Sequence, residues 1–288
     1  MTDAAKVLTT VRRASSLFRA TPGRQGSVVV LDEAEEVMVV GDLHGNVPAF
    51  RQVLEVSALT KNPGRHLVLQ ELVHGPRMYP NDGGDKSHQL VDLVCALKCA
   101  CPERVHLILG NHELSELTGR PIGKNGVPLN GLFRQGVETA FGAAADEVIS
   151  AYHELFASLP LAVRTPNRVL LCHTIPEARE LDRIGLAILN VTNWAVDHEM
   201  KRGGAVYAIT WGRDDSAETI DRFASLMNAD LFITGHQPCD DGFRQANHRQ
   251  LIVDGTDPYP TYCLFPAKTP VTIDTLMQGV KVLPMPVS

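Results

Sequence analysis

Short uninterrupted apolar runs recur along the chain, and most of them end at a glycine or a polar residue. Six runs rich in valine, isoleucine and leucine lie at residues 28–31, 37–40, 66–69, 105–109, 169–172 and 231–234. Runs of this length, without regular alternation of polar and apolar residues, are typical of strands buried on both faces. The pattern therefore predicts an α/β protein whose sheets lie in the interior.

Helical periodicity separates several of these runs. Apolar residues recur every three to four positions in residues 47–59 and 87–99, which predicts an amphipathic helix in each segment. Residues 72–86 contain glycine, proline, asparagine and aspartate without a clear period, and they predict a loop. Residues 115–150 should form a loop followed by helices, and residues 177–229 should be largely helical.

The two ends of the chain differ in pattern. Residues 1–26 predict a short helix followed by a loop, as a surface arm or cap rather than a targeting peptide. The tail predicts three more strands, at residues 250–253, 261–265 and 271–273. Because no repeat and no proline- or glycine-rich linker divides two cores, we expect residues 27–288 to form a single domain of mixed sheets and flanking helices.

Composition narrows the class of protein without deciding its function. Hydrophobic residues make up 44% of the chain and charged residues 21%, which is typical of globular proteins. The net charge of −6 and the lack of a long basic run argue against binding a nucleic-acid duplex through a broad positive face. No signal peptide and no membrane-spanning run is visible in the sequence, so we expect a cytoplasmic protein with no membrane partner.

The six cysteines form no C-x-x-C pair. Cys95, Cys99 and Cys101 fall in one predicted helix and its exit. Three thiols could bind a metal, but without a partner cluster we interpret them as packing residues. This use of cysteine is typical of a reducing compartment.

Four of the apolar runs are followed at once by carboxylate, imidazole or amide side chains. In chain order these belong to Asp42, His44, Asn111, His173 and His236. Such a mixture of oxygen and nitrogen ligands suits Mn²⁺, Fe or Zn²⁺. Each residue alone has an ordinary explanation, such as a surface pair, a helix cap or a core histidine. Together, in this order, they favour two adjacent metal ions acting on a phosphate.

His112 follows Asn111 directly, so its side chain should point away from the metal and toward the bond that breaks. An imidazole at that place could protonate a leaving oxygen as a general acid. The segment 110–113 also has a second explanation, in which Asn111 caps the start of a helix.

Three segments resemble motifs of the calcineurin-like metallophosphoesterases, in particular those of the phosphoprotein phosphatase branch. They are Gly-Asp-Leu-His-Gly-Asn at 41–46, Gly-Asn-His-Glu at 110–113 and Gly-His-Gln at 235–237. The resemblance runs from about residue 37 to residue 265. It implies a four-layer α/β/β/α sandwich, with two mixed β-sheets flanked by helices, and a dinuclear metal site.

The resemblance also implies a division of the ligands between the two ions. One metal would be held by Asp42 and His44, and the other by Asn111, His173 and His236. A hydroxide that bridges the ions would attack phosphorus in line, and the histidine next to Asn111 would be the general acid.

The second motif of that family, Gly-Asp-x-x-Asp-Arg-Gly, is altered in this chain. Glu71 follows the strand at 66–69, where the bridging aspartate should be, and a side chain one methylene longer could still bridge. Residues 82–87 resemble the second half of the motif, which implies an inserted loop between the halves. If Glu71 does not bridge, Asp82 or Asp85 is next in line.

The partner of His112 depends on how this altered motif is aligned. Asp82 would orient His112, as a carboxylate fixes a catalytic imidazole. His74 is the alternative candidate for that position, or it could be an extra metal ligand.

The phosphate-binding arginine of the motif is also missing, since Gly83 stands in its place. Arg77, in the inserted loop, and Arg213, in Trp-Gly-Arg-Asp-Asp, could replace it, because a guanidinium grips phosphate with two parallel hydrogen bonds. A solvated surface arginine is the other explanation for each.

Together these patterns predict a metal-dependent hydrolase of phosphomonoesters, most simply a phosphatase for phosphoserine or phosphothreonine in proteins. Its cofactors would be two divalent ions, Mn²⁺ and/or Fe, with Zn²⁺ also suitable. Its partner would be a phosphorylated protein or a small phosphoester. Two alternatives stay open: a hydrolase of dinucleoside polyphosphates or other nucleotides, and a catalytically impaired relative that acts as a binding module.

Overall fold

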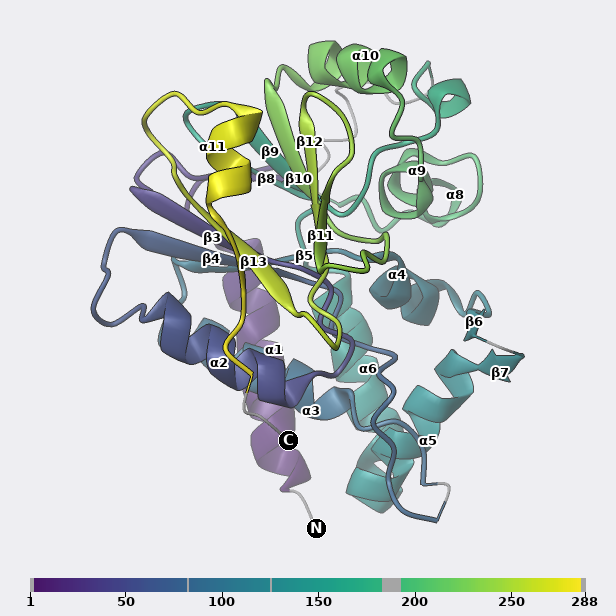
Figure 1. The fold of residues 1–288 in the computed structure, drawn as a ribbon. Helices are drawn as coiled ribbons and strands as arrows, with labels where there is room; N and C mark the ends of the chain where they lie inside the picture. The colour runs from purple at the N-terminus through teal and green to yellow at the C-terminus, as the bar shows by residue number, and fades with distance from the viewer. Residues whose placement is uncertain (1–2, 82, 125, 183–192, 286–288) are drawn as a thin grey trace.

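In the computed structural model, two β-sheets face each other and helices cover the outer face of each sheet (Figure 1). The structure describes residues 3–81, 83–124, 126–182 and 193–285. Buried valine, leucine and isoleucine side chains from both sheets fill the space between them, and other buried residues lie between the sheets and the helices. The four-layer α/β/β/α sandwich is therefore confirmed.

The two sheets are mixed. Among the described residues, one sheet has seven strands, in the spatial order β1 (Arg24–Gln25), β2 (Val28–Val30), β8 (Ala162–Arg164), β9 (Val169–Cys172), β10 (Leu231–Thr234), β12 (Gln250–Val253) and β11 (Phe243–Gln245). The other sheet has five, in the order β14 (Val280–Val282), β13 (Thr261–Pro266), β3 (Glu36–Val40), β4 (Arg65–Gln70) and β5 (Val105–Ile108).

The strands that precede the candidate ligands run parallel to their neighbours. In one sheet β3 pairs with β4, and β4 pairs with β5, with Leu69 opposite Leu107. In the other sheet β9 pairs with β10, with Ile233 opposite Leu171. The carboxyl ends of parallel strands meet at one edge of a sheet, so the side chains that follow these strands lie close together.

Helices form the two outer layers (Figure 1). On the side of β3 and β4 lie α1 (Ala4–Arg19), α2 (Val47–Ser57), α3 (His88–Ala100), α5 (Leu129–Phe141) and α6 (Ala145–Phe156). On the other side lie α8 (Asp197–Met200), α9 (Ala205–Trp211) and α10 (Ala217–Met227). Three short elements lie between β5 and α5. They are α4 (Asn111–Thr118) and the two strands of a hairpin, β6 (Gly123–Lys124) and β7 (Val127–Pro128). None of the helices in the described ranges is both long and apolar enough to cross a membrane.

The helix predicted in residues 1–26 is α1, and one face of it is part of the core. Leu8, Val11 and Phe18 are buried, and the helix packs against α3 and α6. Asp3 caps its start, since its carboxylate accepts a hydrogen bond from the backbone N–H of Lys6 (3.2 Å). The N-terminal segment therefore contributes to the helical layer beneath the sheet.

The structure corrects one strand in the tail. The strand predicted at residues 271–273 is wrong, because Thr272 begins a helix, α11 (Ile273–Gln278). Its hydroxyl accepts from the backbone N–H of Thr275 (3.2 Å), and the Thr275 hydroxyl accepts from the backbone N–H of Thr272 (3.3 Å). This capping box satisfies N–H groups that a strand would have left for a neighbour.

The segment predicted as largely helical, residues 177–229, contains a short 3₁₀ helix (Ala178–Glu180) and then α8, α9 and α10. Residues 183–192 lie outside the described residues. The short strands β1, β8, β11 and β14, with two or three residues each, had no apolar run long enough to predict them.

Candidate active site

The residues predicted to bind metal come together where the strands end. The segments after β3, β4 and β5 supply one side of the cluster, and the segments after β9 and β10 supply the other. The side chains that meet are Asp42, His44, Glu71, Asn111, His173 and His236, which are at most partly exposed. Residues up to 194 positions apart are thus in contact, as shown by the bond from the His236 backbone N–H to Asp42 Oδ2 (2.7 Å).

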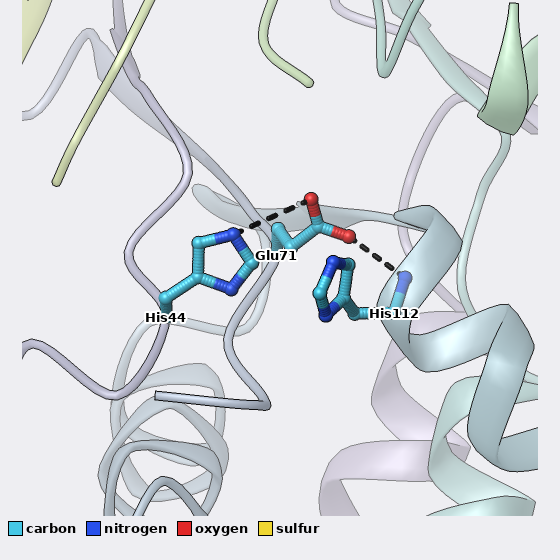
Figure 2. Close-up of side chains that lie close together, drawn as sticks. All are labelled: His44, Glu71 and His112. Carbon is cyan, nitrogen blue, oxygen red and sulfur yellow. Dashed lines mark hydrogen bonds and ion pairs between the residues drawn. The ribbon is translucent and has the colours of Figure 1, made fainter. Parts of the chain in front are cut away.

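Glu71 lies at the centre of this cluster. Its Oε2 is 3.3 Å from Nε2 of His173 and 3.8 Å from Nε2 of His44. Its Oε1 accepts a hydrogen bond from the backbone N–H of His112 (2.8 Å). Figure 2 shows the Glu71 carboxylate between His44 and His112. A carboxylate in this position could contact an ion on each side, as a bridging ligand must.

The imidazole of His44 is oriented by the loop that follows β4. Its Nδ1 lies 2.9 Å from the carbonyl oxygen of Val73, so Nδ1 carries the proton that is donated to that oxygen. Its Nε2 is then left with a lone pair that faces Glu71. This is the tautomer that a metal ligand needs.

Two groups of potential ligands share Glu71. One group is His44, Glu71 and His112, and the other is Glu71, His173 and His236, with the ligand atoms in each group within 4.8 Å of one another. Asn111 adds an amide oxygen 2.9 Å from Nε2 of His173. Nitrogen and oxygen donors in two such groups fit two divalent ions of the Mn²⁺, Fe or Zn²⁺ type.

Two unpartnered atoms support this fit. Asp42 Oδ1 and His236 Nε2 are buried and have no hydrogen-bond partner. A buried polar atom without a partner costs free energy, and most such atoms in proteins are paired with protein, water or an ion. The residues present therefore fit metal ions, which would satisfy both atoms.

The two central carboxylates have opposite pKa shifts. Burial raises the pKa of Asp42 well above its ordinary value, and the charge of Glu71 raises it further. Burial would also raise the pKa of Glu71, but the imidazoles of His173, His112 and His44 lower it well below its ordinary value. Two carboxylates in one buried site resist ionising together, and cations between them would remove that conflict.

His112 has a partner from the segment after β4. Its Nδ1 lies 2.9 Å from Nδ1 of His74, and Nε2 of His74 lies 2.7 Å from Oε1 of Glu116. The pKa of His112 is lowered to about 3, mainly by burial and in addition by the histidines around it, while the charge of Glu71 opposes the shift. His74 thus occupies the position for which Asp82 was the first candidate. Asp82 lies outside the described residues, and its predicted role stays a prediction.

Asp85, an alternative to Glu71 as the bridging ligand, is used elsewhere. Its Oδ2 accepts from the backbone N–H of Gly75 (3.1 Å) and from the hydroxyl of Ser87 (2.9 Å). These bonds tie the inserted loop to the start of α3. Glu71, and not Asp85, therefore lies between the histidines.

Both candidate arginines line the cavity above the cluster, which has a volume of about 570 Å³. Arg77 donates from Nη2 to Oδ2 of Asp257 at the rim (3.0 Å). The pKa of His236 is lowered to about 2, mainly by burial, then by His173, with a smaller contribution from the charge of Arg213. Two guanidinium groups at one cavity could contact a phosphate.

Two residues that support the site had not been predicted as site residues. Glu113 accepts from the backbone N–H groups of Leu72 (2.7 Å) and Val73 (3.3 Å), and so holds the segment after β4. Burial and the charge of Glu71 raise its pKa to about 8. Gln70 places Oε1 3.3 Å from Nδ1 of His173. Glu113 belonged to the Gly-Asn-His-Glu segment, whereas nothing in the sequence indicated Gln70.

Backbone strain is concentrated at this site. His44, Glu71, His74 and His236 all have positive φ angles, of 39°, 47°, 63° and 67°. Non-glycine residues rarely adopt this conformation, and they cluster at functional sites when they do. The close fit extends to Gly235, where a Cβ atom would lie 2.2 Å from Asp42 Oδ1.

A family model adds an independent observation to this geometry. The model for calcineurin-like phosphoesterases matches residues 36–240, a span that contains every candidate metal ligand. The chain belongs to the calcineurin-like phosphoesterase family. Its altered second motif is thus a variation within a phosphoesterase, and the cluster at the strand ends lies within the matched span.

Two curated relatives of this phosphoesterase are named as serine/threonine-protein phosphatases. A probable serine/threonine-protein phosphatase of Encephalitozoon cuniculi is 26% identical over 237 residues, which are 76% of this chain and 46% of that protein. The PP2A-like serine/threonine-protein phosphatase PPG1 of Candida albicans is 27% identical over 230 residues, 72% of this chain and 48% of that protein. The chain therefore spans about half the length of these relatives.

Two solved structures with a similar fold are described as phosphatases. A protein serine/threonine phosphatase from Saccharomyces cerevisiae, described as similar to human PP5, has a TM-score of 0.70 at 17% identity, over 97% of this chain and 89% of that chain. A cold-active protein-tyrosine phosphatase of a psychrophilic Shewanella has a TM-score of 0.59 at 15% identity, over 90% and 83%. At these identities the likeness establishes the shared fold.

Proposed function

We propose that this phosphoesterase is a metal-dependent protein phosphatase that removes phosphate from phosphoserine or phosphothreonine side chains. The observation that carries the proposal is the position of Glu71, which is shared by two groups of potential metal ligands. The named functions of the curated relatives support the choice of a protein substrate.

The metal ligands divide as the family resemblance implies. Asp42, His44 and Glu71 would hold one ion, and Glu71, Asn111, His173 and His236 would hold the other. Bound there, Mn²⁺ and/or Fe (Zn²⁺ also suits these donors) would supply positive charge for the phosphate oxygens and activate a water molecule.

The remaining residues would bind the phosphate and move a proton. Arg77 and Arg213 would orient the phosphate from the cavity wall. His112 would donate a proton to the serine or threonine oxygen as the bond from that oxygen to phosphorus breaks. Because burial lowers the pKa of His112 to about 3, the negative charge of the bound phosphate must favour its protonated form.

A binding module without turnover is the competing function, because the second motif is altered. Five intact ligand positions argue against it, since loss of function more often removes several ligands. The free thiols of all six cysteines support a reducing compartment, and we propose a cytoplasmic location. We also propose that residues 27–288 form one catalytic domain.

The test of the proposed function is a substrate panel on protein reloaded with Mn²⁺ after chelation. We expect phosphoserine and phosphothreonine peptides to be hydrolysed faster than a phosphotyrosine peptide, a mononucleotide or a dinucleoside polyphosphate. Asp42→Asn should abolish turnover, and the exposed control Asp241→Asn should leave it unchanged. Preferred hydrolysis of the dinucleoside polyphosphate would contradict the proposed substrate, and a fully metal-loaded protein without turnover would be a binding module.

A further inference from the structure

Away from the metal cluster, a chain of buried polar side chains runs from His112 into the protein. The contacts pass from Nδ1 of His112 to Nδ1 of His74 (2.9 Å), and from Nε2 of His74 to Oε1 of Glu116 (2.7 Å). The His74 side chain is fully buried and the Glu116 side chain is 8% exposed. Glu116 has no part in binding the metals or the phosphate, so its burial needs another explanation.

Glu116 is held in place from several sides. It lies four residues after His112 on α4, so the two side chains project from the same face of that helix. Asn130, at the start of α5, donates from Nδ2 to its Oε1 (2.8 Å). His153, on α6, places Nε2 4.0 Å from its Oε2. A carboxylate fixed by three helices can in turn fix the ring that it contacts.

The chemistry of these atoms determines where the protons lie. The carboxylate of Glu116 can only accept a hydrogen bond, and the nearby imidazoles of His153 and His74 lower its pKa despite burial, so it is ionised. His74 must then carry its proton on Nε2, which leaves a lone pair on Nδ1. That lone pair accepts the proton of His112 Nδ1. In Figure 2 the other ring nitrogen of His112 points toward the Glu71 carboxylate, and this nitrogen is Nε2.

We propose that Glu116 and His74 are positioning residues, which hold His112 in the orientation and tautomer that present Nε2 to the leaving oxygen of the substrate. The inference rests on the proposed phosphatase function, because it assigns a supporting pair to the proposed general acid. A histidine and a glutamate in series thus do the work that a single aspartate of the second motif would do.

The step balances with water as the co-reactant, since an oxygen of water forms the new bond to phosphorus. As the bond from phosphorus to the leaving oxygen breaks, the proton on His112 Nε2 passes to that oxygen, which leaves as an alcohol. His112 becomes neutral and keeps its Nδ1 proton, which it still donates to His74. Glu116 stays ionised throughout and stabilises the positive charge of the rings before the transfer.

The experiment compares substrates that differ in their need for an acid. Phenyl phosphate and a phosphoserine peptide have poor leaving groups, which must be protonated, whereas 2,4-dinitrophenyl phosphate has a leaving group that departs without a proton. In Glu116→Ala we expect kcat to fall by at least about tenfold for the first two substrates. For 2,4-dinitrophenyl phosphate we expect little change, and KM and metal content should stay at the wild-type values.

Two further variants serve as controls. Glu116→Gln keeps an oxygen that accepts from His74, so it should retain more activity than Glu116→Ala and should preserve the fold. Glu138→Ala removes an exposed glutamate of the neighbouring helix α5 and should leave all rates unchanged. If Glu116→Ala fails to fold, the comparison of Glu116→Gln with wild type across the three substrates decides the question by the same criterion.

Two outcomes would overturn the inference while leaving the proposed function intact. An equal loss for all three substrates would mean that Glu116 only supports the structure. Unchanged rates for all three would mean that His112 does not depend on it. If the wild-type protein hydrolyses none of them, the proposed function fails.

If the wild-type protein hydrolyses none of the three substrates, NMR still tests the positions of the protons on these histidines. Long-range ¹H–¹⁵N spectra of the zinc-loaded protein should show protons on His74 Nε2 and His112 Nδ1, with a mixture of tautomers for His74 in Glu116→Ala. Protons on the opposite nitrogens, or no change in the variant, would refute the inference.

Discussion

Glu71 is the residue on which the arrangement of the site depends. Its two oxygens face different partners, His173 at 3.3 Å and the backbone of His112 at 2.8 Å. The left-handed backbone conformation at Glu71 (φ 47°) turns the chain sharply after β4, and the longer side chain ends between the histidines. A glutamate can therefore take the place of the aspartate that the second motif lacks.

Replacing Glu71 should weaken metal binding directly. In Glu71→Gln, one charged oxygen donor becomes an amide, and we expect metal affinity to fall by about 10–100-fold or more. Metal content after dialysis against dilute Mn²⁺ measures this, with the exposed Glu55→Gln as control. If occupancy equals that of the wild type, the bridging oxygen comes from another residue.

Replacing His112 should separate acid catalysis from metal binding. His112→Asn should lower kcat by about 10²–10⁴-fold, while metal content stays near two ions per chain. The comparison is informative because His112 also lies in one of the two ligand groups. Loss of metal in this variant would show that His112 is a ligand and not the acid.

The sequence indicated well which side chains cluster at the strand ends, and it indicated the partner of His112 only in part. Each of the clustered residues follows closely after an apolar run, so its place at a strand end could be predicted. Glu116 could not be predicted, because its contact with His74 depends on the path of the loop after β4 and on how α4 packs against α5. The sequence left His74 as a rival to Asp82, and the contact with His112 favours His74.

At the scale of secondary-structure elements, the central strands were predictable and the edges were not. β3, β4, β5, β9 and β10 are buried along most of their length, so apolar residues dominate their sequences. The strand predicted at residues 271–273 failed for a local reason, since β-branched residues suggested a strand while the Thr272 hydroxyl and its capping partner began a helix. Side-chain capping therefore outweighed strand propensity there.

A contact between a histidine of β4 and a histidine of β5 should make the free energy of unfolding depend on pH. Nδ1 of His66 lies 3.0 Å from Nε2 of His106. Burial lowers the pKa of His66 from its ordinary value of 6.5 to about 4, with contributions from the charges of Arg104 and Lys98. Because the folded state disfavours the protonated ring, the free energy of unfolding should be highest above pH 6.5 and fall as the pH decreases to 4.

Urea unfolding at several pH values between 4 and 7.5 measures this dependence. His66→Asn should flatten the decrease, since asparagine does not take up a proton. His198→Gln, at a side chain that is 77% exposed, serves as the control and should leave the slope unchanged. A slope in His66→Asn equal to that of the wild type would assign the decrease to other groups.

At the scale of the whole molecule, the site joins the two sheets. Asp42 and Glu71 follow strands of one sheet, and His173 and His236 follow strands of the other, so metal ions bound among them would cross-link both layers. The unpartnered atoms Asp42 Oδ1 and His236 Nε2 are unfavourable without an ion. Metal binding should therefore stabilise the fold as well as serve catalysis.

Chelation should reveal this coupling. At a free Mn²⁺ concentration about 100 times Kd, a single bound ion adds about 2.7 kcal/mol to the free energy of unfolding, and its removal should cost that amount. Thermal unfolding with and without the ion measures the shift in Tm, and Asp42→Asn should show a smaller shift. Identical melting curves for wild type in both conditions would mean that no ion binds the folded site.

The most direct test of the account is anomalous X-ray diffraction from crystals grown with Mn²⁺. We predict two anomalous peaks about 3.5–4 Å apart. One peak should lie among Asp42, His44 and Glu71, and the other among Glu71, Asn111, His173 and His236. A single peak, or peaks that do not share Glu71, would contradict the dinuclear site on which the proposed phosphatase function rests.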